Sequence, residues 1–267
     1  MPSTKAAVAV EREEKGGGAQ TLMRGLDVLN AVSEGPVTLP VLATRLGLTR
    51  STTHRLASAL VERRFLSFRA REGYSLGPKL LELGYCARQQ LHIPRIARPY
   101  LEELSEETGD AVHLGVLEGD SALYLDKMPG RRRILIGSRI GERHPIATTG
   151  VGKALILDLD ETRWRQLYPR GADGKQNAKQ LALWLERMRG YAKAGYAFDL
   201  EENEDQIRCV AAPIRGVDGK IVAAISVSSA AQYMDDARMQ ALIPQVRGAA
   251  DAISAELGWS EAPAPRV

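Results

Sequence analysis

The chain has 267 residues, enough for one large domain or two smaller ones that each bury a core. Its 44% hydrophobic and 26% charged residues are typical of a soluble globular protein. No apolar run approaches the ~20 residues of a membrane helix and the N-terminus does not resemble a signal peptide, so we expect a cytoplasmic protein without a membrane partner.

Residues 1–19 contain three consecutive glycines and no apolar periodicity, which predicts a disordered lead-in. Leu22, Leu26 and Leu29 then repeat at helical spacing. They predict a first helix that ends near Gly35.

Two further helices are predicted by their capping residues. Thr38 is placed to cap a second helix, Gly47 to end it in a turn, and Thr49 to cap a third helix. The inward positions of the third helix are Thr53, Leu56, Ala57 and Leu60. Its outward positions are Ser51, Arg55, Ser58 and Glu62.

Two short strands, 65–68 and 74–76, follow the third helix and flank a basic tip at 69–73. Three helices and a basic hairpin in this order predict a winged helix-turn-helix over 20–77, which places one helix in the major groove of DNA. The segment carries eight Arg and four Asp or Glu, a net charge of +4, which favours a DNA partner.

The side chains expected to contact DNA are long donors and short hydroxyls at the start of the third helix and arginines at the hairpin tip. They are Thr49, Arg50, Ser51, Thr52, His54, Arg55, Arg69 and Arg71. The alternative interpretation is an ordinary helical hairpin with a solvated basic face.

Residues 78–91 predict a linker helix, and 92–258 predict a second domain. Its strands are expected at 111–117, 121–125, 134–136, 207–214 and 221–228, with helices before and after them. Strands that come mostly in adjacent pairs predict an α+β domain with an antiparallel sheet flanked by helices. We expect 259–267 to be a disordered tail.

The segment Thr148–Lys153 is a hydroxyl- and glycine-rich turn that opens a helix. Such a turn presents backbone N–H groups that suit a small anion such as a carboxylate, although a capped helix start without a ligand has the same pattern. The spacing of a P-loop is missing.

The chain resembles the IclR family of bacterial transcriptional regulators over about 20–258. The resemblance rests on motifs in family order: Met23–Leu29, Gly47–Leu56, Tyr74–Pro78, Gly137–Gly141, Thr149–Ala154, Gly195–Ala197, Asp199–Glu202, Cys209–Pro213, Ala224–Ser228 and Ile253–Gly258. Arg64 departs from it by standing where the family usually has glycine. The helix expected at 177–194 also lacks the threonine-rich entry often seen in the family.

The resemblance implies a GAF-like effector domain behind the DNA-binding domain. Its effector-binding positions correspond to Gly150, Val151, Asp199, Cys209, Ser226 and Ser228. It further implies a repressor or activator that binds a palindromic double-stranded operator as a homodimer or homotetramer. Segment 137–146 is most similar to that of regulators of sugar-acid catabolism, which favours a hydroxy or keto sugar acid over an aromatic acid as the effector.

Two alternatives remain for the second domain. An enzyme would use Cys209 as a nucleophile, but no histidine forms a recognisable pair with it in the sequence, so we expect no catalytic residues. A metal-responsive regulator would use His113 or His144 with carboxylates, but the sequence offers no ligand cluster. We therefore predict neither a metal site nor a cofactor. Cys86 and Cys209 lie in no zinc or disulfide pattern. Without a ligand, Cys209 would be a buried structural thiol, and Ser226 and Ser228 would form a polar face of the sheet.

Overall fold

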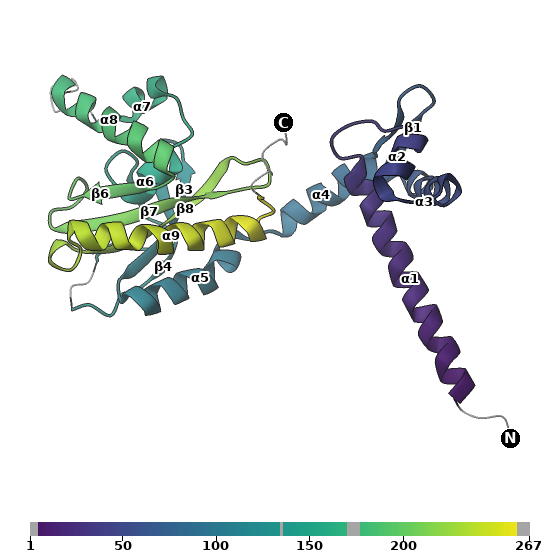
Figure 1. Cartoon of the computed structure of the whole chain (residues 1–267). Helices are drawn as coiled ribbons and strands as arrows, with labels where there is room; N and C mark the ends of the chain where they lie inside the picture. The colour runs from purple at the N-terminus through teal and green to yellow at the C-terminus, as the bar shows by residue number, and fades with distance from the viewer. Residues whose placement is uncertain (1–4, 134–135, 170–176, 261–267) are drawn as a thin grey trace. The chain divides into compact units, whose positions relative to one another are not determined.

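The computed structural model describes residues 5–133, 136–169 and 177–260. The chain divides between Gln90 and Leu91 into two compact units, each with its own hydrophobic core (Figure 1). Residues 134–135 of the strand expected at 134–136, and most of the tail expected at 259–267, lie outside the described residues.

The N-terminal unit contains four helices and a two-stranded hairpin among its described residues. Its elements are α1 (Lys5–Ala31), α2 (Leu39–Leu46), α3 (Arg50–Glu62), β1 (Leu66–Arg69), β2 (Gly73–Leu76) and α4 (Pro78–Gln90). Val28 and Val32 of α1, Leu42 of α2 and Leu56 of α3 are buried together in its core. This is the winged helix-turn-helix that the sequence predicts.

The turn between α2 and α3 follows the predicted chemistry with one exception. Gly47 adopts a left-handed conformation, with φ of 63°, and Thr49 caps α3 by accepting a hydrogen bond from the Thr52 backbone. Thr38 occupies the N-cap position of α2, but its side chain makes no capping hydrogen bond. A proline in the first turn of α2 removes one of the N–H groups that such a cap would satisfy.

Helix α1 begins at Lys5, so residues 5–19 are helical where the sequence analysis expects disorder. The expectation gave weight to the three glycines, each of which costs a helix about 1 kcal/mol relative to alanine. The rest of the segment is rich in Ala, Glu, Lys and Arg, which favour a helix, and contains no proline after Lys5.

Arg64, where the family resemblance leads us to expect glycine, lies between α3 and the hairpin with a φ of 62°. The position therefore keeps the left-handed backbone that glycine adopts without cost, although an arginine there costs about 1 kcal/mol. The Arg64 carbonyl accepts a hydrogen bond of 3.1 Å from the backbone of Lys79, in the first turn of α4. Gly77 packs on the same carbonyl, since a Cβ there would lie 2.2 Å from it. The wing base and the start of α4 are thus joined at one peptide group.

The C-terminal unit has an antiparallel sheet with helices on both faces. Its strands are β3 (Ala111–Glu118), β4 (Ser121–Met128), β5 (Arg143–Pro145), β6 (Ala197–Leu200), β7 (Ile207–Arg215) and β8 (Ile221–Ala230). Its helices are α5 (Ile93–Thr108), α6 (Gly150–Leu155), α7 (Glu161–Leu167), α8 (Ala178–Ala194), the 3-10 turn η1 (Ala231–Tyr233) and α9 (Asp236–Glu256). The strand order is β5-β4-β3-β8-β7-β6, which agrees with the predicted α+β class.

Helices α5 and α9 pack along one face of this sheet, and the short helix α6 covers the other, with α7 and α8 beyond it (Figure 1). An apolar row crosses the sheet on a register of paired residues. Phe198, Val210, Val227 and Val112 are successive partners on β6, β7, β8 and β3, and all four are buried. Burial of such a row fixes the register, because a slip by one residue would move every side chain to the opposite face.

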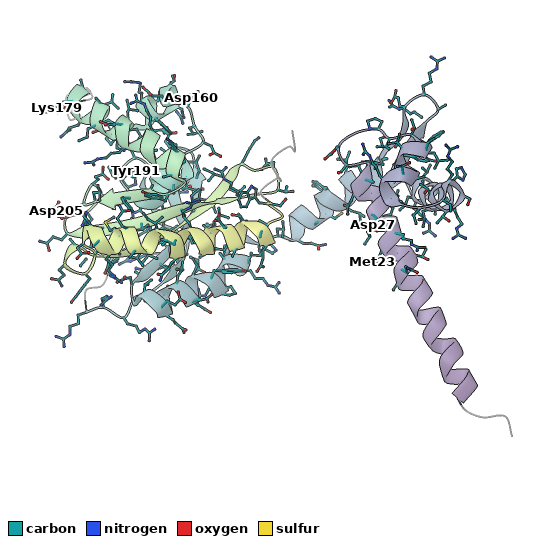
Figure 2. The ribbon with its side chains drawn as sticks, viewed as in Figure 1. Met23, Asp27, Asp160, Lys179, Tyr191 and Asp205 are labelled. Atoms are coloured by element: carbon teal, nitrogen blue, oxygen red, sulfur yellow. The ribbon has the colours of Figure 1, made fainter. Side chains whose placement is uncertain are left out.

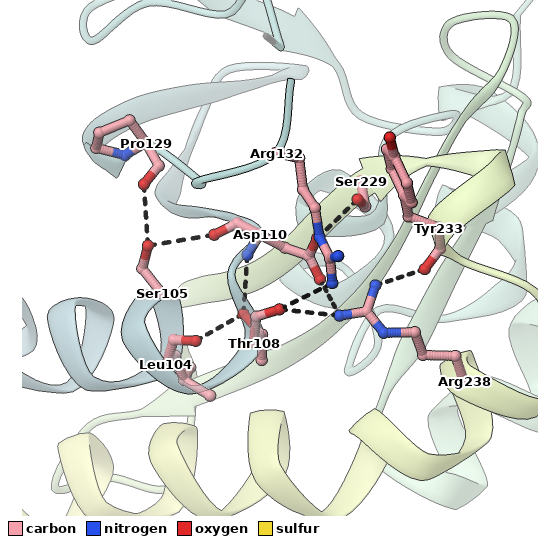
Figure 3. Close-up of polar contacts among 9 residues, drawn as sticks. All are labelled: Leu104, Ser105, Thr108, Asp110, Pro129, Arg132, Ser229, Tyr233 and Arg238. Atoms are coloured by element: carbon pink, nitrogen blue, oxygen red, sulfur yellow. Dashed lines mark hydrogen bonds and ion pairs between the residues drawn. The ribbon is translucent and has the colours of Figure 1, made fainter. Parts of the chain in front are cut away.

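A buried carboxylate ties three segments of the C-terminal unit together (Figure 3). Asp110, between α5 and β3, pairs with Arg132 (Nε–Oδ1, 3.1 Å) and with Arg238 of α9, and accepts a hydrogen bond of 2.7 Å from the Ser229 hydroxyl. Arg132 also lies over the Tyr233 ring, 5.1 Å from its centroid. Two guanidinium groups therefore share one carboxylate that has no contact with solvent.

We predict that Asp110→Asn destabilises the C-terminal unit by ~3 kcal/mol, because it leaves two partly buried arginines without a counter-charge. Urea unfolding of the full-length protein followed by circular dichroism measures this change. The matched control is Asp120→Asn, which breaks an exposed ion pair with Arg163 and should cost less than about 1 kcal/mol. Equal effects of the two substitutions would contradict the structural importance of Asp110.

Candidate functional site

Hydroxyl groups hold the exposed start of α3. Thr49 Oγ1 accepts a hydrogen bond from the Thr52 backbone N–H (3.3 Å), donates to Thr52 Oγ1 (2.9 Å) and lies 3.2 Å from Ser51 Oγ. The cap satisfies one of the free N–H groups of the first helical turn. Thr49 and Thr52 therefore order the helix start as well as facing the surface where DNA contacts are predicted.

The long donors predicted to contact DNA are exposed on the same unit. Arg50, His54 and Arg55 of α3 are exposed, and neither arginine forms a salt bridge with a residue in the described ranges. At the hairpin tip Arg71 is exposed, while Arg69 forms a solvent-exposed pair with Glu72 (3.3 Å). Unpaired, exposed guanidinium groups are suited to bind phosphates and guanine edges.

A groove of ≈ 440 Å³ lies between α3 and the hairpin. His54 and Ser58 line it from α3, and Phe68 and Tyr74 line it from the two strands of the hairpin. The hairpin itself is fixed to the rest of the unit, because Tyr74 pairs with Val37 through two backbone hydrogen bonds of 2.8 Å. The third helix and the wing thus form one surface.

In the C-terminal unit, strand pairing brings the predicted effector positions together. Asp199 of β6 is the register partner of Cys209 on β7, which is the partner of Ser228 on β8. Directly paired residues of antiparallel strands place their side chains on the same face of the sheet. The three side chains, all buried, therefore form a polar row on the face covered by α6.

A second polar row lies beside the first and includes residues that sequence analysis did not assign to the effector site. Ser226 of β8 pairs with His113 of β3, which pairs with Lys127 of β4. Ser226 Oγ lies 3.4 Å from Ser228 Oγ, and Ser228 Oγ lies 3.4 Å from His113 Nδ1. The two rows are consequently in contact through serine hydroxyls.

The turn before α6 packs directly on the first row. Thr149 caps α6 by accepting a hydrogen bond of 3.0 Å from the Gly152 backbone. Gly150 touches Cys209, since a Cβ on Gly150 would lie 2.4 Å from the sulfur. Val151 fits over Gly115 of β3, where a side chain would come within 2.7 Å of it. Glycine is therefore required at both close approaches.

A buried ammonium group lies next to this turn. Lys153 is 1% exposed, and its Nζ donates a hydrogen bond to the Phe198 carbonyl (2.8 Å) and pairs with Glu202. The Glu202 backbone N–H donates to Asp199 Oδ1 (2.9 Å). Burial raises the pKa of Asp199 to about 6, although the Lys153 charge and the backbone hydrogen bonds oppose the rise.

Cys209 is a protonated thiol rather than a nucleophile in this setting. Burial, together with the charge of Asp199, raises its pKa to about 12, against opposing hydrogen bonds from the Gly150 backbone and Ser228. A thiol with so high a pKa contributes no thiolate near neutral pH.

Among the described residues no group of three or more His, Cys, Asp or Glu is arranged to hold a metal ion.

A cavity of ≈ 30 Å³ adjoins the polar rows. Ser228 and Lys127 line one side of it, and Arg132 of the Asp110 cluster lines another. This volume holds about one water molecule, so an organic acid enters this cavity only if neighbouring side chains move.

None of the helices in the described ranges is long and apolar enough to span a membrane.

The raised pKa of Asp199 makes stability depend on pH. The unfolded chain releases this proton near pH 4, whereas the folded protein keeps it until about pH 6, so the folded state loses stability as pH rises through this window. We predict that Asp199→Asn removes this loss and is more stable than wild type by about 3 kcal/mol at pH 8.

Urea denaturation of both proteins between pH 4 and pH 8 measures the difference. The contribution of other titrating groups is common to both and cancels. Asp205→Asn, at an exposed position, is the matched control and should follow the wild-type curve. A constant difference between wild type and Asp199→Asn across this range would show that Asp199 titrates normally.

Comparisons with known proteins cover nearly the whole chain. Residues 86–255 match the family described as bacterial transcriptional regulator IclR C-terminal, and residues 21–70 match the IclR helix-turn-helix domain. The HTH-type transcriptional regulator XynR of Escherichia coli (strain K12) is 33% identical over 246 residues, 90% of this chain and 98% of its own. BhcR of Paracoccus denitrificans (strain Pd 1222) is also 33% identical, over 90% of this chain and 88% of its own.

Solved structures show the same fold. The Agobacterium tumefaciens repressor BlcR matches with a TM-score of 0.75 and 24% identity, covering 92% of this chain and all of its own. The Thermotoga maritima IclR matches with a TM-score of 0.56 and 26% identity, over 90% of this chain and all of its own. These relatives are transcriptional regulators and not enzymes, which agrees with the absence of catalysis predicted from the sequence. The chain belongs to the IclR family of DNA-binding bacterial transcriptional regulators, with an effector domain that follows its helix-turn-helix domain in the sequence.

Proposed function

We propose that the C-terminal unit binds a small hydroxy or keto acid, of which a sugar acid is the favoured kind, and that this acid modulates operator binding. The observation that carries the proposal is the buried row Asp199–Cys209–Ser228 facing the Gly150 turn. The buried groups of this row are paired with neighbouring side chains and backbone groups, and the oxygen atoms of a ligand can replace those partners.

In this proposal the acid is held by groups of complementary chemistry. The backbone N–H groups of Gly150 and Val151 bind the carboxylate, and the hydroxyls of Ser226 and Ser228 bind an oxygen on the neighbouring carbon. Asp199 accepts a hydrogen bond from a hydroxyl of the ligand. The protonated Cys209 supplies a small apolar contact beside the carboxylate.

The close packing of the Gly150 turn on the sheet gives a reason why binding would affect DNA. Because Gly150 already packs directly on Cys209, the acid would bind to a rearranged form of the site. A ligand that binds one conformation more tightly than another shifts the population toward it. A ligand that stabilises the rearranged site would therefore also favour whichever conformation of the protein accompanies that rearrangement, and so change its binding to DNA.

At the DNA end we propose that Arg50 and Arg55, with His54 and Ser51, enter the major groove, and that Arg69 and Arg71 bind the backbone beside it. Thr49 and Thr52 hold the start of α3 against a phosphate. These side chains are exposed, and Arg50 and Arg55 are free of salt bridges within the described ranges. The protein would act in the bacterial cytoplasm, on the nucleoid when bound.

Exposed apolar side chains on α1 and α4 support a homo-oligomer. Leu22 and Met23 of α1 are 64% and 59% exposed, and Leu81 and Tyr85 of α4 are 79% and 67% exposed; Met23 projects from α1 in Figure 2. Large apolar side chains gathered on one element mark interaction surfaces. A twofold dimer through them would present two α3 helices to a palindromic operator, and two dimers would form a tetramer.

We predict that Arg55→Ala weakens binding to DNA by about 10- to 100-fold, because it removes a bidentate donor from the groove. The measurement is fluorescence anisotropy of the full-length protein with a DNA fragment that the wild type has selected from random sequence. The matched control is Arg133→Ala, an exposed arginine of the C-terminal unit, which should leave affinity unchanged. Undiminished binding by a folded Arg55→Ala protein would overturn the assignment of α3 to the groove.

We further predict that hydroxy or keto acids raise the melting temperature of the full-length protein, since a ligand at about 100 times its Kd stabilises the folded state by ~2.7 kcal/mol. Glycolate, pyruvate, gluconate, benzoate and zinc chloride form the screen. Ser228→Ala should reduce the shift with the acids, while Ser121→Ala, a serine at the far end of β4, should not. A response to zinc without a response to any acid would instead favour a metal-responsive regulator.

A further inference from the structure

An aromatic ring between two imidazoles forms a wall beside the polar rows. Tyr124 of β4 lies with its ring centroid 5.0 Å from that of His113 and 4.3 Å from that of His144, on which it stacks. Tyr124 is the register partner of Gly115, the residue over which Val151 packs. The wall therefore continues the proposed effector site in the direction away from Asp199, on the side of β4 and β5.

His113 is a neutral hydrogen-bonding group at this position. Burial, with the charge of Lys127, lowers its pKa to about 3. Its Nε2 lies 2.8 Å from Ser138 Oγ and its Nδ1 lies 3.4 Å from Ser228 Oγ. The ring is consequently held between two hydroxyls and presents no charge to a ligand near neutral pH.

The ammonium group of Lys127, the register partner of His113, hydrogen-bonds to backbone carbonyls. Its Nζ donates hydrogen bonds of 2.7 Å to the backbone carbonyls of Ile136 and Ser138. Burial lowers the pKa of Lys127, and the Glu142 charge partly opposes this. A second carboxylate on the ligand would find no free cation among the described residues here.

His144 carries a nitrogen without a hydrogen bond. Its Nε2 is buried and has no hydrogen-bond partner among the residues that the structure describes, and the Glu142 carboxylate oxygen lies 3.6 Å away. Burial lowers the pKa of His144, and the Glu142 and Glu204 carboxylates only partly offset this. A buried polar atom without a hydrogen bond is unfavourable, and a ligand hydroxyl would supply the missing bond.

These groups discriminate between classes of acid. A dicarboxylate meets the charges of Glu142 and Glu204 rather than a free cation. An aromatic acid would leave the His144 nitrogen without a hydrogen bond, which disfavours such a ligand relative to one that carries a hydroxyl there. A chain of hydroxyl-bearing carbons instead offers hydrogen bonds to His144 and Ser138, and its C–H groups can pack on the Tyr124 ring.

We propose that His144 and Tyr124 are the specificity-determining residues of the effector site and select a polyhydroxylated monocarboxylic acid: His144 binds a hydroxyl beyond the carboxylate, and the Tyr124 ring packs on the carbons that carry the hydroxyls. His113, which is held by Ser138 and Ser228, positions the hydroxyls of these two serines. The inference rests on the proposed function, because it takes the carboxylate to lie at the Gly150 turn. Beyond the proposed function, the inference assigns recognition of the ligand hydroxyls to the end of the site at β4 and β5, and to the Nε2 atom of His144.

The test is isothermal titration of the full-length protein with gluconate, which carries a chain of hydroxyls, and with glycolate, which carries one beside its carboxylate. His144→Phe keeps a ring that can stack on Tyr124 and removes both nitrogens. We expect it to lower affinity for gluconate about tenfold, the effect of one hydrogen bond between neutral groups, and to leave affinity for glycolate unchanged. His144→Gln, which retains a polar group, should recover part of the loss.

The matched control is His92→Phe, at an exposed histidine before α5, which should affect neither acid. An equal loss for gluconate and glycolate would assign His144 a structural role and overturn the inference while leaving the proposed function intact. Tighter binding of succinate or benzoate than of gluconate would also overturn it. If wild type binds none of the acids, the proposed function fails and this inference fails with it.

Discussion

The antiparallel pairing of β6, β7, β8 and β3 is the constraint on which the effector site depends. In the apolar row, Val210, Val227 and Val112 lie on strands that pack against α5 and α9, while Phe198 on the edge strand β6 contacts Tyr191 of α8. The polar row Asp199–Cys209–Ser228 lies one residue further along each strand. Because side chains alternate between faces, burying the first row fixes the second on the opposite face. The packing energy of the core therefore positions the polar groups, which would be costly to bury on their own account.

The polar groups of the two units are exposed to different degrees, in keeping with the different ligands expected for them. In α3 the arginines are exposed and solvated, since their expected partner is a long polyanion that meets the surface. In the C-terminal unit Asp199, Ser226 and Ser228 are buried, with the Gly150 turn packed on them. A small acid must be desolvated to be distinguished from other acids, whereas a phosphate backbone need not be.

Local signals were readable in the sequence, and contacts between strands were not. Gly47 and Thr49 act as predicted because a left-handed turn and an N-cap are set by neighbouring residues. His113 and His144 occupy separate segments, and only strand pairing, with a register shift after Leu114, places both on the Tyr124 ring. The family resemblance supplied Asp199 and Cys209, but no spacing in the sequence indicates that they are register partners. The glycine run misled in the opposite sense, because α1 continues through it.

The peptide group of Arg64 has a mechanical consequence. It follows α3, precedes β1, and accepts the Lys79 hydrogen bond from the first turn of α4. Gly77 closes on it so tightly that no side chain fits between them. Because α4, the end of α3 and the base of the wing are tied together at this peptide group, a rotation of α4 would move α3 and the wing together. Reorienting α4 by a few degrees would thus re-aim both DNA-contacting elements together instead of loosening one against the other.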